Sequence, residues 1–126
     1  MINKLCKDYL QALNDGNLDN VLNLFTSDGV VVSPLYGEMP AEKFYTDLFK
    51  DTNRSETSLL NIFTSDMNEK SVALHFQYKW TLKDGTPVKF ECVDVFEITE
   101  DKSKFTKLKI IYDTAPIRED FNKSRT

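Results

Sequence analysis

The chain has 126 residues, 40% of them hydrophobic and 29% charged, and its formal net charge is −4. It is long enough for one domain with a hydrophobic core and too short for two. The acidic balance, without a run of Lys or Arg, argues against a nucleic-acid-binding protein. No segment resembles a signal peptide or a membrane span, so we expect a cytoplasmic protein.

The first half of the chain is predicted to be mainly helical. Apolar side chains recur at steps of three and four in residues 2–14, which indicates an amphipathic helix. The β-branched run at residues 30–32 favours a strand, which Pro34 ends. In chain order we predict helices at 2–14, 18–25 and 41–49, one strand at 30–32, and a loop at 35–40.

The second half is predicted to be a meander of strands at 59–64, 71–82, 88–98 and 105–113. Residues 71–82 alternate strictly between two kinds of side chain, and Asp84-Gly85 is a typical hairpin turn. Helices that cover one face of an antiparallel sheet give an α+β fold, and a curled sheet can leave a cavity on its concave side. We expect one domain at residues 1–115 and a frayed polar C-terminal tail at 116–126.

One acid interrupts an otherwise apolar strand face. Because strand residues alternate between faces, Phe90, Cys92, Phe96 and Ile98 lie on the same side as Asp94. A buried carboxylate is costly when it is charged, so burial favours the neutral acid. A neutral acid can donate a hydrogen bond to a carbonyl or enolate oxygen in a dry pocket. The alternative is a structural aspartate bonded to backbone groups or to a tyrosine.

The remaining chemistry-bearing residues give no cofactor or metal motif. Cys6, Cys92 and the single His75 lack the spacing of a zinc site, so we predict two buried free thiols and no metal. No glycine-rich phosphate-binding loop is present, so we predict no nucleotide cofactor.

Short motifs follow one another in an order that resembles a known family. They are Tyr9-Leu10, Asn14-Asp15-Gly16 with Leu18, Phe25-x-x-Asp28, Val31-Val32-Ser33-Pro34, Phe44-Tyr45 and Val93-Asp94-Val95-Phe96. The ordered set spans about residues 5–115 and resembles ketosteroid isomerases and SnoaL-like polyketide cyclases of the nuclear transport factor 2-like superfamily. The resemblance implies a cone-shaped, cystatin-like α+β fold, with three N-terminal helices on the concave face of a curved antiparallel sheet. It also implies a deep pocket and a homodimer through the outer sheet face.

The resemblance assigns roles to two residues and leaves a third role open. Tyr9 and Asp94 match the tyrosine and the neutral carboxylic acid that form the oxyanion hole of ketosteroid isomerases. The general base of those enzymes precedes the proline that ends the first strand, and Ser33 stands there in this chain. A neutral serine cannot take up a proton without a base beside it. Other conceivable bases are Glu38, Asp113 and His75, which more ordinarily would be solvated or interface side chains.

Further residues on the same faces are predicted to line the pocket. The predicted ligand-binding residues are Leu13, Ser33, Phe44, Phe76, Tyr78, Trp80, Cys92 and Tyr112. Most of them can equally serve as core packing, although the polar ends of the tyrosines and of the tryptophan need a hydrogen-bond partner or a ligand.

Three functions fit these patterns. One is a cofactor-independent isomerase, cyclase or dehydratase acting on a small hydrophobic carbonyl compound. Another is a binding protein that uses the same pocket without catalysis, which the serine at the base position favours. The third is an interaction module that uses the outer sheet face, where Val93, Val95 and Ile111 also suit a homodimer interface.

Overall fold

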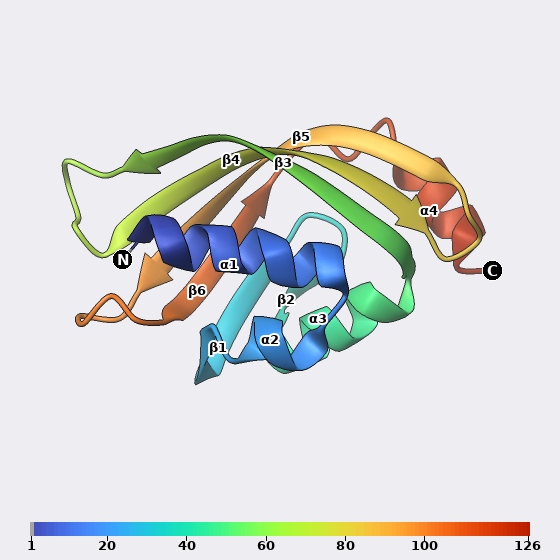
Figure 1. Cartoon of the computed structure of the whole chain (residues 1–126). Coiled ribbons are helices and arrows are strands. Elements are labelled where there is room, and N and C mark those ends of the chain that lie inside the picture. The colour runs from blue at the N-terminus through green and yellow to red at the C-terminus, as the bar shows by residue number, and fades with distance from the viewer. Residues whose placement is uncertain (1) are drawn as a thin grey trace.

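Six strands form one curved sheet in the computed structural model, which describes residues 2–126 (Figure 1). The strand order is β2-β1-β6-β5-β4-β3. The helices are α1 (Ile2–Asp15), α2 (Leu18–Leu22), α3 (Ala41–Lys50) and α4 (Arg118–Ser124), and the strands are β1 (Phe25–Ser33), β2 (Gly37–Pro40), β3 (Thr52–Thr64), β4 (Ser71–Leu82), β5 (Pro87–Ile98) and β6 (Phe105–Ile111). Neighbouring strands are antiparallel except β1 and β6, which are parallel.

The first three helices lie on the concave side of the sheet. In Figure 1, β3, β4 and β5 arch over α1, and α2 and α3 lie beside it. The buried stripe of α1 contains Leu5, Tyr9, Leu10 and Leu13, at the helical spacing predicted from the sequence. The α+β fold with a curved sheet is therefore confirmed.

The long central strands present one buried face to these helices. In β4 every second residue from Val72 to Leu82 is buried, and in β5 the buried residues include Cys92, Asp94 and Phe96. This alternation is the one that the sequence predicts, and it places the lone acid on the inner face.

The chain between α2 and β4 contains more strand than we predicted. Phe25 begins β1 instead of ending α2, and residues 37–40 pair with β1 as β2 instead of forming a loop. Gly37, at φ +84°, makes the turn that joins this pair. β3 begins at Thr52, whereas we predicted a strand from residue 59. Its first half is polar and carries no apolar signal of its own, and it forms a strand because it pairs with β4.

The predicted frayed tail is wrong, because residues 118–124 form helix α4. Ile117 and Phe121 lie four residues apart and are both buried. The Phe121 ring packs against the rings of Trp80 and Tyr36, with centroids 5.6 and 5.4 Å away. The tail therefore belongs to the folded structure, at the end of the sheet near the β4–β5 turn (Figure 1).

No helix among residues 2–126 combines the length and the apolar character needed to cross a lipid bilayer.

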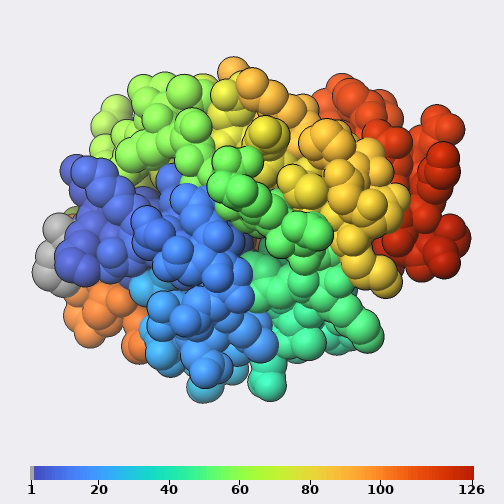
Figure 2. Space-filling view, turned by 45° about the vertical axis from the view of Figure 1, so that its right-hand side comes forward, coloured from blue at the N-terminus to red at the C-terminus, as the bar shows by residue number. Residues whose placement is uncertain are grey.

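The space-filling view shows the N-terminal helices (blue) and the α3 region (green-blue) covering one face side by side, with the C-terminal segment (red) at one end (Figure 2).

Candidate functional site

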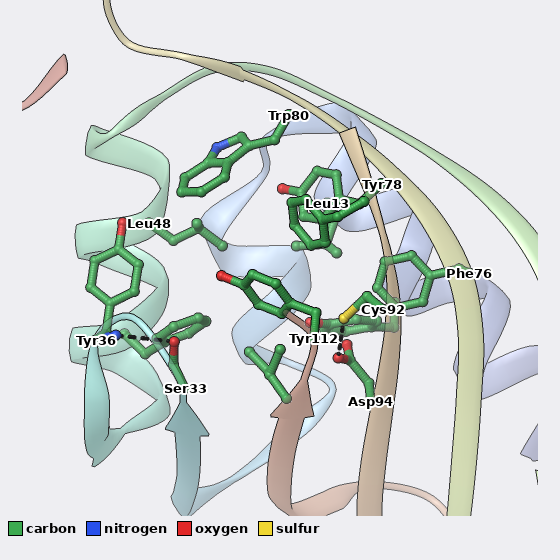
Figure 3. A pocket seen from close by; sticks show the side chains of 14 residues that line it. Leu13, Ser33, Tyr36, Leu48, Phe76, Tyr78, Trp80, Cys92, Asp94 and Tyr112 are labelled. Atoms are coloured by element: carbon green, nitrogen blue, oxygen red, sulfur yellow. Dashed lines mark hydrogen bonds between the residues drawn. The ribbon is translucent and has the colours of Figure 1, made fainter. Parts of the chain in front are cut away.

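A cavity lies between the helices and the inner face of the sheet, and all ten predicted site residues line it (Figure 3). They are Tyr9 and Asp94 together with Leu13, Ser33, Phe44, Phe76, Tyr78, Trp80, Cys92 and Tyr112. The prediction did not include four more lining residues, Tyr36, Leu48, Phe90 and Ile110. Phe90 and Ile110 follow from strand alternation, whereas Tyr36 is placed by the unpredicted β1–β2 hairpin.

Regular spacing brings these side chains together. Two helices each supply a pair four residues apart, Tyr9 with Leu13 and Phe44 with Leu48. Alternate residues of β4 and β5 supply the opposite wall. Eight of the lining residues are aromatic, so most of the cavity lining is flat and apolar.

The cavity is small. Its volume is about 40 Å³, whereas an engineered apolar cavity that binds benzene has a volume of about 150 Å³. An organic ligand therefore enters only when lining side chains move. The four half-buried lining residues form the mouth, and they are Tyr36, Phe90, Ile110 and Tyr112. The rings of Phe90 and Tyr112 stack there with their centroids 4.3 Å apart.

Among the described residues 2–126, Asp94 is the one carboxyl group that lines the cavity. Only 2% of the residue is exposed, and burial raises its pKa from 3.8 to about 7, against the smaller opposing influence of Cys92 and Tyr9. The Cys92 thiol donates a hydrogen bond to the Asp94 carboxyl, with sulfur and oxygen 3.1 Å apart. At neutral pH a large fraction of Asp94 is therefore the neutral acid, which can donate a hydrogen bond.

Tyr9 lies beside this acid and is bonded to a second tyrosine. The hydroxyl oxygens of Tyr9 and Tyr45 are 2.8 Å apart, and both residues are buried. Burial raises the pKa of both phenols, and the nearby Asp94 adds to the shift of each. Tyr45 was not among the predicted site residues, although the Phe44-Tyr45 motif that carries it was recognised.

Three other polar groups of the cavity wall are bonded to the protein. Tyr78 shares a hydrogen bond of 2.7 Å with Ser55. The Trp80 indole donates to the Thr52 hydroxyl at 2.7 Å, and the Tyr36 hydroxyl donates to the Asp51 carboxylate at 2.6 Å. These bonds direct polar ends away from the cavity, which leaves its centre largely apolar.

Ser33 lines the cavity, but its hydroxyl group stabilises the turn that follows β1. Its hydroxyl oxygen accepts hydrogen bonds from the backbone N–H groups of Leu35 and Tyr36, each at 3.1 Å. No ionisable group that could act as its base contacts it within the described residues 2–126.

The other conceivable bases lie outside the cavity. Glu38 and Asp113 are exposed, and the Asp113 carboxylate accepts a hydrogen bond from the Ala115 backbone. The His75 ring lies on the outer sheet face, 3.3 Å from the Glu91 carboxylate. Among residues 2–126 no three His, Cys, Asp or Glu side chains gather as a metal site would require.

A family model with the description "SnoaL-like domain" matches residues 6–106 of the chain. A search of curated proteins found no significant match.

Solved structures with the same fold are similar to almost the whole chain. A protein with a ketosteroid isomerase-like fold from Catenulispora acidiphila, in complex with trimethylamine, has a TM-score of 0.79 at 13% identity, over 94% of this chain and 92% of that one. TerC, co-crystallised with polyporic acid, has a TM-score of 0.79 at 14% identity, over 96% and 98% of the two chains. PrhC from Penicillium brasilianum has a TM-score of 0.80 at 13% identity, over 98% and 86%.

Proposed function

The chain belongs to the SnoaL-like domain family, and from this premise we propose that its cavity binds a small hydrophobic carbonyl compound and activates the carbonyl group. The observation that carries the proposal is the buried Asp94 carboxyl at the wall of an aromatic cavity, where burial raises its pKa to about 7 and favours the neutral acid. Co-crystallisation of TerC with polyporic acid supports a small organic ligand for this fold.

The carbonyl oxygen of the ligand would accept hydrogen bonds from Asp94 and Tyr9. Removal of a proton next to a carbonyl group places negative charge on that oxygen, and donors fixed in a dry site stabilise this charge strongly. The hydrogen bond with Tyr45 orients the Tyr9 hydroxyl before a ligand arrives. Isomerisation and cyclisation of carbonyl compounds both pass through such an enolate, and neither requires a cofactor.

Asp94 is the lining group that exchanges a proton near neutral pH. Burial raises the pKa of the Cys92 thiol far above neutrality, so this thiol stays protonated. Burial likewise keeps the phenols of Tyr78 and Tyr112 protonated, because it raises their pKa values. A cycle that uses Asp94 as the oxyanion donor therefore needs a base from outside the cavity wall to accept the proton of the substrate.

A second candidate function is binding without catalysis. Ser33 favours it, because this residue occupies the position of the family's base and its oxygen serves the turn into the β1–β2 hairpin. The same cavity would then hold the carbonyl compound and release it unchanged.

The test is turnover of 3-cyclohexen-1-one, a small unsaturated ketone whose isomerisation gives a conjugated product followed by ultraviolet absorbance. Catalysis predicts turnover that Asp94→Asn and Tyr9→Phe each reduce by at least tenfold. Full activity in both variants would reject these residues as the oxyanion hole.

Binding is measured in parallel by the fluorescence of Trp80, the one tryptophan of the chain, which lines the cavity. Saturable quenching by cyclohexanone without any turnover would support the binding function. The variant Ser33→Asp then restores a carboxylate at the base position while keeping an oxygen for the turn. Turnover that arises only in Ser33→Asp would show that the wild type does not catalyse the isomerisation because it lacks this base.

A further inference from the structure

Helix α4 packs against the mouth of the cavity through a single aromatic ring. Of its seven residues only Phe121 and Ser124 are buried. The Phe121 ring lies 5.4 Å from the ring of Tyr36 and 5.6 Å from that of Trp80, measured between centroids, and both of these residues line the cavity. Because Tyr36 is one of the four mouth residues, it cannot turn outward while Phe121 covers it.

Hydrogen bonds fasten both ends of α4 to loops of the sheet. At its start, the Arg118 guanidinium donates to the Pro34 carbonyl oxygen at 3.1 Å. At its end, the Ser124 hydroxyl accepts a hydrogen bond from the Asp84 backbone N–H at 3.2 Å. Pro34 follows β1 and Asp84 lies in the β4–β5 turn, so α4 bridges two loops that meet at one end of the sheet (Figure 1).

Arg125, directly after α4, ties the helix to the same mouth residue. The Tyr36 hydroxyl donates to the Asp51 carboxylate at 2.6 Å, and the Arg125 guanidinium lies 3.5 Å from that carboxylate oxygen. The guanidinium also lies over the rings of Tyr36 and Phe121, 5.8 and 5.2 Å from their centroids, which is a cation–π arrangement. Asp51 is only 8% exposed, so its charge depends on these partners.

The connection between β6 and α4 has the properties of a hinge. The Ala115 N–H donates to the Asp113 carboxylate, and the Ile117 N–H donates to the Thr114 carbonyl oxygen. These bonds are local, so a rotation of residues 113–116 does not have to disturb the sheet. Elements with few buried residues open at a lower free energy than the core does.

We propose that α4 is a lid, and that the cavity fills and empties when α4 swings away from Tyr36 and Trp80 about the connection at residues 113–116. In the closed position Phe121 and Arg125 hold Tyr36 at the mouth. In the open position Tyr36 is free to turn outward, which widens a cavity that is too small for an organic molecule. Lid opening controls access for any occupant and therefore goes beyond the proposed function.

The two cysteines provide a test that needs no ligand. Cys92 lines the cavity and is 2% exposed, whereas Cys6 is 0% exposed and lies outside the cavity lining. The native protein is treated with methyl methanethiosulfonate, a small neutral thiol reagent, and the modification of each cysteine is followed by peptide mass spectrometry. Cys92 should react whenever the lid opens, and Cys6 only when the chain unfolds. Cys92 should therefore react faster, at a rate that low urea concentrations leave unchanged.

Variants of the lid should change the Cys92 rate according to the contact that each one removes. Phe121→Ala should raise the rate on the order of a hundredfold, because a buried aromatic ring is lost, and Phe121→Leu should raise it less. Arg125→Gln should raise it about threefold, since it removes a partly exposed ion pair. Lys123→Gln is the matched control, because it removes an exposed charge from the same helix and should leave the rate unchanged.

Val21→Ala separates lid opening from unfolding. Val21 is buried in α2, which packs on α1, α3 and β1, so this variant should accelerate the reaction of Cys6 but not that of Cys92. Equal rates for the two cysteines, or equal acceleration of both by Val21→Ala, would overturn the lid. A Cys92 rate that Phe121→Ala and Arg125→Gln leave unchanged would also overturn it. Because no ketone is added, each of these outcomes leaves the proposed function standing.

Discussion

Tyr9 in α1 and Tyr45 in α3 meet hydroxyl to hydroxyl, with their oxygens 2.8 Å apart, although 36 positions separate them in the sequence. Both phenols stay protonated, because burial raises the pKa of each. Two hydroxyl groups bonded to each other use one hydrogen between them, so the pair keeps a second hydrogen for another acceptor. Since Tyr9 lines the cavity and Tyr45 lies behind it, Tyr45 can hold the Tyr9 hydroxyl toward a ligand.

We therefore expect Tyr45→Phe to weaken ketone binding through Tyr9. The substitution removes one buried hydrogen bond and should lower the free energy of unfolding by about 1 kcal/mol. Acetophenone affinity should fall about threefold in Tyr45→Phe and should not fall further when Tyr45→Phe is added to Tyr9→Phe. Additive losses in a calorimetric double-mutant cycle would show that Tyr45 does not act through Tyr9.

Stability should depend on pH through Asp94. Its pKa is raised from 3.8 to about 7 by burial, so the folded protein binds this proton more tightly than the unfolded chain does. The resulting stabilisation is complete below about pH 4 and is lost as the pH rises to 7, a span equivalent to about 4 kcal/mol. Asn cannot ionise, so Asp94→Asn should gain stability relative to the wild type over this range.

Urea unfolding of both proteins at pH 4, 5.5, 7 and 8.5 measures this difference. Substitution of the exposed Asp66 by Asn provides a control that removes a solvated carboxylate. A difference between Asp94→Asn and the wild type that stays constant with pH would contradict a raised pKa for Asp94.

Helix α4 should contribute measurably to stability through Phe121. Its ring is 4% exposed and packs on Trp80 and Tyr36, and the nearby Arg125 guanidinium lies 3.5 Å from the Asp51 carboxylate. We expect Phe121→Ala to lower the free energy of unfolding by about 3 kcal/mol. Phe63→Ala provides the matched control, because that ring is 52% exposed and should cost far less. Equal effects in urea titrations would contradict the packing of α4.

The outer sheet face should bind a second copy of the chain. The register places Val93 next to His75 and Ile111, and Val95 next to Ala73 and Lys109, so a group of apolar side chains spans three strands with His75 and Lys109 beside it. Charge at the centre of an apolar interface is costly, so Val95→Lys should convert a homodimer into a monomer in sedimentation experiments. Asp66→Lys, in the β3–β4 connection, is the control. A monomeric wild type at high micromolar concentration would contradict this prediction.

The sequence predicted the cavity well because its wall is built from regular elements. Alternation along β4 and β5 and a four-residue step along α1 fix the direction of each side chain, so Phe76, Cys92, Asp94 and Leu13 could be assigned before any coordinates. The motif order that resembles the family added Ser33 and Phe44.

The missed features depend on pairing and packing partners that no local sequence pattern reveals. Tyr36 reaches the cavity only because β2 folds back on β1, and the polar start of β3 becomes a strand only by pairing with β4. The apolar pattern of α4 is short, consisting of Ile117 and Phe121. The helix is held in place because Phe121 packs against the rings of Trp80 and Tyr36. The secondary-structure propensity of a segment does not reveal which partners it will pack against.

The parallel pairing of β1 with β6 has a consequence for how the chain is made. β1 lies near the N-terminus, but one of its two neighbours is the last strand, with Val31 opposite Leu108. During synthesis the edge of β1 that pairs with β6 thus stays unpaired until about residue 108 has left the ribosome, and the closure of so long a loop is slow. Until then the nascent chain exposes an unpaired strand edge that can pair with another chain. A chaperone would protect the chain best at this stage.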